Sequence, residues 1–137
     1  MKYPKSPQET VGGIVYFGRM LEKMRLMAAG ELHPDLHANL GKGFDDRCVV
    51  FLGVDYEALR AKVLEGLTDE QALDWCFENG KRPNDDEIEI WNAFMSKRGW
   101  NDVLTETLIR RKKESGFEAR DEIQTMFQYI DADEGRA

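Results

Sequence analysis

After Ile14, apolar side chains recur at spacings of three and four as far as Ala28, and charged residues fill many of the positions between them. This pattern is typical of an amphipathic helix that turns one face toward a protein core. Gly30 is a suitable residue to end such a helix. The predicted apolar face consists of Ile14, Phe17, Met20, Leu21, Met24, Met27 and Ala28.

Shorter apolar stripes, several of them behind capping residues, predict six further helices. Thr68 and Asn84 each open a capping box, in which a side chain and the Gln or Glu three residues later bond to backbone N–H groups. Asp55 is a third predicted N-cap, and Asp45 or Asp46 fills that role for the helix before it. The predicted helices cover about residues 45–52, 55–65, 69–79, 85–98, 102–115 and 123–130.

The helix after Asn84 has the clearest predicted ending. Gly99 favours the left-handed conformation that closes many helices, and Trp100 then folds back onto Met95. The residues expected to face inward from this helix are Ile88, Trp91, Phe94 and Met95.

The remaining segments do not change the fold class. Residues 6–9 have the form of a helix start, which Gly12 and Gly13 interrupt. Residues 32–43 read mostly as loop, and no run of residues alternates as a strand. The sequence therefore predicts an all-α protein: a single compact domain of six or seven helices over residues 1–137, with residues 1–5 and 131–137 loosely ordered.

Composition and charge exclude several classes of protein. The 137 residues are 42% hydrophobic and 33% charged, with a net charge of −7, so the chain can fold and lacks the basic surface of a nucleic-acid binder. We expect no membrane association, because no apolar run is long enough to cross a bilayer and no signal-peptide core follows Met1. Cys48 and Cys76 lie among apolar neighbours, which predicts buried reduced thiols and a cytoplasmic protein.

Two segments carry a resemblance to a known family. They are WNAFMSKRGW at residues 91–100 and MFQYIDADEGR at residues 126–136, supported by residues 6–13 and FLGVD at 51–55. The chain resembles the bacterial family catalogued as domain of unknown function 5069. The resemblance implies a small bacterial protein that stands alone, and it transfers no functional residue.

One histidine pair is the weak candidate for a metal site. His33 and His37 are four residues apart, a spacing that places two rings on one side of a helix. Pro34 and the absence of a His-Glu-x-x-His motif favour a solvated loop instead, and no cofactor fingerprint occurs elsewhere. The sequence therefore predicts no metal and no cofactor.

Two functional hypotheses remain open. The leading one is a binding or regulatory module without catalysis of its own, whose groove is edged by Tyr16, Trp75 and Tyr129. These aromatic residues lie at the margins of their apolar stripes, as residues of binding or self-association surfaces often do. The partner would be a protein, a small molecule or a second copy of the chain. The alternative is an enzyme or small-molecule-binding protein with a pocket near Asn92, Ser96, Arg98 and Trp100.

Overall fold

A computed structural model describes residues 1–136 and contains seven α-helices, one 3-10 helix and one β-hairpin over that range. The prediction of an all-α domain is confirmed, with the hairpin as a small addition. The elements are β1 (Thr10–Val11), β2 (Ile14–Val15), α1 (Phe17–Ala28), η1 (Pro34–Asn39), α2 (Phe44–Leu52), α3 (Tyr56–Leu64), α4 (Asp69–Asn79), α5 (Asp85–Lys97), α6 (Thr105–Glu114) and α7 (Met126–Asp133).

The hairpin replaces the helix start predicted at residue 6. Ser6 Oγ does accept a hydrogen bond from the Gln8 N–H, but the chain then enters β1, which pairs antiparallel with β2. Gly12 and Gly13 both have positive φ angles and form the turn between the strands. The first long helix consequently begins at Phe17, three residues later than predicted.

Local capping patterns predicted three of the helix starts. Capping boxes at Thr68 and Asn84 and an N-cap at Asp55 are confirmed. The prediction for α2 is wrong, because Gly43 is its N-cap and Asp45 lies inside its first turn. The last helix has the predicted length but lies three residues later, at Met126–Asp133, and begins behind a Thr125 capping box.

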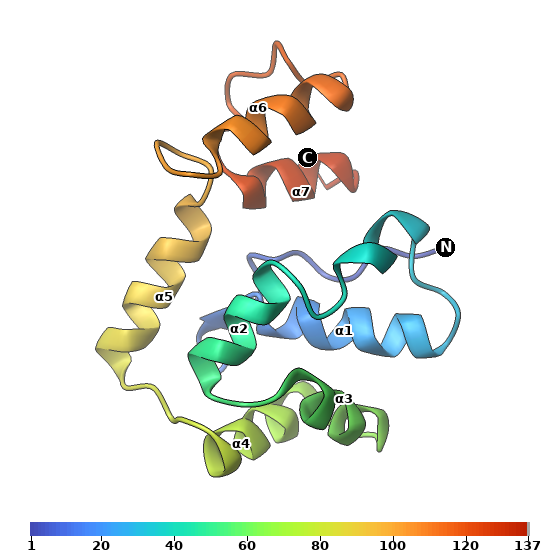
Figure 1. The fold of residues 1–137 in the computed structure, drawn as a ribbon, viewed down its shortest axis with the longest axis vertical. Helices are drawn as coiled ribbons and strands as arrows, with labels where there is room; N and C mark the ends of the chain where they lie inside the picture. The colour runs from blue at the N-terminus through green and yellow to red at the C-terminus, as the bar shows by residue number, and fades with distance from the viewer. Residues whose placement is uncertain (137) are drawn as a thin grey trace.

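Figure 1 shows two groups of helices connected by α5. The hairpin and α1 to α4 form one group, and α6 and α7 lie side by side at the other end of the molecule (Figure 1). α5 runs along one edge and contacts both β2 and α7. It is the longest helix, with 13 residues, and within residues 1–136 no helix has the length and apolar character needed to cross a membrane.

Two apolar clusters form the core, and the larger one also takes in Phe127 of α7. The larger one surrounds α1 and includes both cysteines, which are free and buried as predicted. The smaller one consists of Leu108, Ile123, Met126 and Tyr129. Phe44, at the start of α2, packs partly against both clusters and therefore lies at the boundary between the two groups.

The end of α5 differs in part from the prediction. Gly99 has the predicted left-handed conformation, with a φ of 100°. It also lies close to α7, because a Cβ at this position would be 3.1 Å from the backbone nitrogen of Met126. Phe94 was predicted to face inward and instead keeps 39% of its surface exposed. The guanidinium groups of Arg47 and Arg98 lie over its ring, which compensates for the incomplete burial. The predicted contact of Trp100 with Met95 stays a prediction.

The two ends of the described chain contact each other. Arg136 donates a hydrogen bond to the carbonyl oxygen of Pro4. Ser6 Oγ donates a hydrogen bond of 3.0 Å to the Asp131 carboxylate. The sequence predicted residues 1–5 and 131–137 to be loosely ordered, and these contacts involve residues of both segments. Ala137 lies outside the described residues.

Candidate functional site

A cavity of about 450 Å³ lies between the two helix groups. One wall comes from α1, η1 and the start of α2, and the other comes from α6 and α7. We call it the interhelical cavity. Its volume falls in the range of roughly 300–1,000 Å³ that is usual for small-molecule sites.

Helix α6 turns a largely polar face toward this cavity. Leu104, just before the helix, and Thr107, Arg111 and Glu114 within it line the cavity. Their spacings of three and four residues place them on one side of the helix. The only residue of α6 that is buried in the apolar core is Leu108. α6 is therefore anchored by little apolar surface and exposes functional groups to the cavity.

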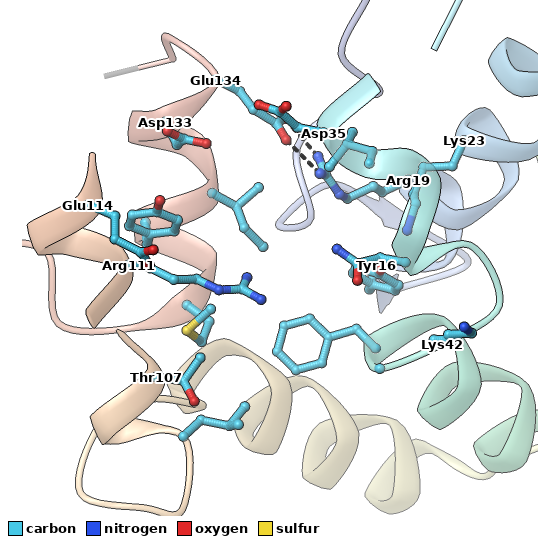
Figure 2. A pocket seen from close by; sticks show the side chains of 18 residues that line it. Tyr16, Arg19, Lys23, Asp35, Lys42, Thr107, Arg111, Glu114, Asp133 and Glu134 are labelled. Carbon is cyan, nitrogen blue, oxygen red and sulfur yellow. Dashed lines mark hydrogen bonds and ion pairs between the residues drawn. The ribbon is translucent and has the colours of Figure 1, made fainter. Parts of the chain in front are cut away.

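Arg111 is the central cation of the cavity. Figure 2 shows its side chain extending from α6 into the space opposite Tyr16. Within residues 1–136 its guanidinium group has no hydrogen bond or ion pair, although the residue is half-buried. Arginine donors in proteins often bind carboxylates or carbonyl groups, so the N–H groups of Arg111 are available to a ligand in the cavity.

The opposite wall contains a buried network around Asp45, whose side chain is completely buried. Its carboxylate accepts a hydrogen bond of 2.5 Å from the Tyr16 hydroxyl and bonds of 3.0 Å from Lys23 Nζ and the Gly41 N–H. Burying a carboxylate requires such compensation. Asp45, which we predicted as a helix cap, thus serves to join α1 to α2.

The same network shifts the pKa values of two residues in this wall. Burial and the neighbouring Asp45 carboxylate raise the pKa of the Tyr16 hydroxyl well above its ordinary value. Burial lowers the pKa of Lys23, and the Asp45 carboxylate opposes that shift. Tyr16 is consequently a neutral donor whose proton is directed to Asp45. Lys23 Nζ is hydrogen-bonded to the same carboxylate.

Tyr16 also has an unusual backbone conformation. Its φ of 74° lies in the left-handed region, which a bulky side chain rarely adopts. The ring lies against Phe127, with the two ring centres 6.1 Å apart, while its hydroxyl is held by Asp45. Contacts at both ends of the side chain hold this strained residue in the cavity wall.

A second ion pair closes one side of the cavity. The guanidinium of Arg19 forms two hydrogen bonds, of 2.8 and 2.6 Å, with the carboxylate of Glu134 (Figure 2). Both side chains are only 3% exposed. Arg19 and Lys23 are therefore each neutralised by a buried carboxylate, in contrast to Arg111.

The three aromatic residues predicted to edge a groove do not all lie together. Tyr16 and Tyr129 both line the interhelical cavity, where Tyr129 places its hydroxyl 2.5 Å from Ser115 Oγ. Trp75 does not line this cavity and instead packs, half-buried, against the larger apolar cluster. The structure thus brings together two of the three residues, from opposite ends of the sequence.

The residues of the alternative pocket have mainly structural contacts. Asn92 bonds to the hairpin through the Val15 N–H and the Gly13 carbonyl, and Ser96 donates to the Ala93 carbonyl. Arg98 is paired with Asp102 and Trp100 is 54% exposed. None of the four lines the interhelical cavity.

Both histidines contact other parts of the protein. The Nδ1 atom of His33 accepts a hydrogen bond from the Asp35 N–H, and its ring stacks on Tyr3. His37 Nε2 lies 2.9 Å from the Leu32 carbonyl oxygen. Within the described part of the chain, no three His, Cys, Asp or Glu side chains are arranged to hold a metal ion.

Sequence reasoning did not single out Thr107. It weighed the basic run at residues 110–113, together with Lys81 and Arg82, as an anion site, but favoured an interaction with the helix dipole and a solvated surface. The sequence of α6 did contain a signal for a polar cavity wall. A helix with so few apolar residues buries little apolar surface, and the face that it turns inward must then be polar.

The fold and the cavity define a small helical protein with a ligand-sized cavity between two helix groups. Residues 1–136 match the model of the family described as Domain of unknown function (DUF5069). The chain therefore belongs to this family, as the resemblance of residues 91–100 and 126–136 indicated. A comparison with curated proteins finds no match.

Proposed function

We propose that this protein reversibly binds a small organic anion in the interhelical cavity. The observation that carries the proposal is Arg111, a half-buried guanidinium that reaches into the cavity and has no partner within residues 1–136. A ligand carboxylate or phosphate would supply the missing acceptor, and arginine binds both groups through paired hydrogen bonds.

The state of the other cations supports an anion at this position. Arg19 and Lys23 are neutralised by Glu134 and Asp45, so neither has to be released for a ligand to bind at Arg111. The cavity wall is already held in place by these pairs. A preformed wall lowers the conformational entropy lost on binding and favours a specific site.

This function combines parts of both sequence hypotheses. It is a binding module that uses Tyr16 and Tyr129, and its partner is a small molecule. The two free, buried thiols support the further proposal that the protein acts in a reducing cytoplasm. The resemblance to a bacterial family supports the proposal that this cytoplasm is bacterial.

Thermal unfolding with a panel of small organic anions tests the proposal. A ligand that binds only the folded state raises the melting temperature as its concentration increases. At least one anion should stabilise the parent protein, and Arg111→Met should reduce the affinity about tenfold or more, since a charge-assisted hydrogen bond contributes roughly 1.5–3 kcal/mol.

The neighbouring residue Arg110 offers a matched control. It lies on the same helix but is exposed, and it does not line the cavity. Arg110→Met should bind the anion as the parent does. Equal loss of binding in both variants would contradict a specific role for Arg111, and the absence of stabilisation by every anion would contradict the proposed function.

A further inference from the structure

We infer that the ligand is a monocarboxylate with a compact apolar body, an inference that rests on the proposed function and specifies its ligand class. Three features carry it: the balance of charges around the interhelical cavity, the pair of donors on α6, and the apolar surfaces beside them.

The charges limit the ligand to a single negative charge. Among residues 1–136, four cationic and four anionic side chains line the cavity: Arg19, Lys23, Lys42 and Arg111, and Asp35, Glu114, Asp133 and Glu134. The buried Asp45 carboxylate behind the wall neutralises Lys23, so these residues leave no surplus of positive charge for a dianion. Lys42 is exposed, which leaves Arg111 as the half-buried cation that compensates one charge on a ligand. A dianion such as a phosphate monoester would bring a second charge close to the carboxylates of the rim, where repulsion opposes binding.

The donors on α6 fit a planar carboxylate. Thr107 and Arg111 are four residues apart on the same helix face, and both line the cavity. The described residues provide no side-chain partner for either of them. A guanidinium presents two parallel N–H groups that match the two oxygens of a carboxylate. The Thr107 hydroxyl adds one further donor one helical turn away.

Apolar groups surround these donors on both walls. Met126 and Ile130 of α7 lie on the side of α6, and Phe44 lies on the opposite wall with the ring of Tyr16. A ligand that carries only a charged group would leave this surface in contact with water. A compact hydrocarbon or aryl group attached to the carboxylate would cover it, and burial of apolar surface would add to the affinity.

Isothermal titration with four matched probes tests the inference. Phenylacetate has both the single charge and the apolar body, whereas acetate lacks the body and phenylacetamide lacks the charge. Benzylphosphonate, at a pH where it carries two charges, keeps the body and doubles the charge. Phenylacetate should bind at least tenfold more tightly than each of the other three.

Variants of Thr107 locate the carboxylate. Thr107→Val should weaken phenylacetate binding severalfold, while Thr107→Ser, which keeps the hydroxyl, should bind within about twofold of the parent. Equal loss in both Thr107 variants would overturn the assigned role of the hydroxyl.

Different binding results contradict the monocarboxylate inference and the proposed function. Benzylphosphonate or acetate binding as tightly as phenylacetate, with dependence on Arg111, would overturn the monocarboxylate inference and leave the proposed function standing. The absence of binding by every organic anion tested would overturn both.

Discussion

Arg19 and Glu134 lie 115 residues apart in the sequence and form a two-pronged ion pair that is almost completely buried. Arg19 belongs to α1, and Glu134 follows the last turn of α7. The pair therefore joins the two helix groups beside the cavity. Arg136 also contacts Glu134, so this carboxylate adds to the contacts that hold the end of the described chain in place.

Glu134→Gln should lower the free energy of unfolding by roughly 3 kcal/mol, because it leaves the buried Arg19 charge without its counterion. Urea denaturation measures the change. Glu118→Gln is a suitable control, since Glu118 is exposed, and it should change stability by less than about 0.5 kcal/mol. Coincident unfolding curves for the two variants would show that the ion pair contributes nothing.

Two tyrosine hydroxyls provide a test of the Asp45 network. Tyr16→Phe removes a donor to a buried carboxylate and should cost roughly 1.5–3 kcal/mol of stability. Tyr56→Phe removes a buried hydroxyl for which the described residues offer no partner, so it should leave the stability unchanged or raise it. The same denaturation experiment compares them, and a larger loss for Tyr56→Phe would contradict the network.

The buried thiols make stability fall at alkaline pH. Burial raises the pKa of Cys76 from its ordinary value of 9.0 to about 12, and it also raises the pKa of Cys48. Between pH 9 and 12 the unfolded chain loses a thiol proton that the folded protein keeps, so rising pH favours unfolding. Each such thiol adds about 1.4 kcal/mol per pH unit to the decline.

The Cys76→Ala variant isolates one of these protons. Between pH 9 and 12, its unfolding free energy should decline less steeply with pH than that of the parent. The difference in slope should correspond to the release of about one proton fewer on unfolding. Chemical denaturation at a series of pH values measures the two slopes. Identical slopes would mean that Cys76 ionises equally well in the folded state.

Gly80 allows a close approach between the ends of α2 and α4. A Cβ at this position would lie 2.2 Å from the carbonyl oxygen of Leu52, so the backbone of Gly80→Ala has to shift. We expect a loss of about 2 kcal/mol or more. At Gly13 a Cβ would contact no other atom, so Gly13→Ala is opposed only by the positive φ of this residue. We expect it to lower the free energy of unfolding by about 1 kcal/mol. A smaller loss at Gly80 than at Gly13, measured by thermal unfolding, would contradict this explanation.

The helices were predictable because their signals are local. Thr68, Asn84 and Asp55 each bond to a backbone N–H within three residues, so neighbouring residues alone determine the cap. Asp45 misled the same reasoning, because Tyr16 and Lys23, 29 and 22 residues away, bind its carboxylate. The hairpin was missed because strands of two residues are too short to show an alternating pattern.

The cavity was beyond prediction for a different reason. What distinguishes Arg111 is that residues 1–136 give it no partner in the folded protein, and a sequence shows only which residue types are present. Tyr16 and Tyr129 were singled out one at a time from their positions on helix faces, and their common cavity depends on how α7 packs beside α1.

The most direct test of the central claim is NMR of the Arg111 side chain during titration with phenylacetate. The claim predicts that the Nε–H resonance of Arg111 shifts in proportion to occupancy, together with backbone amides of Thr107, Met126 and Phe44. The Arg110 Nε–H resonance should remain in place. Shifts confined to residues outside the cavity, such as Asn92 and Trp75, or an Arg111 signal that does not move at saturation, would contradict it.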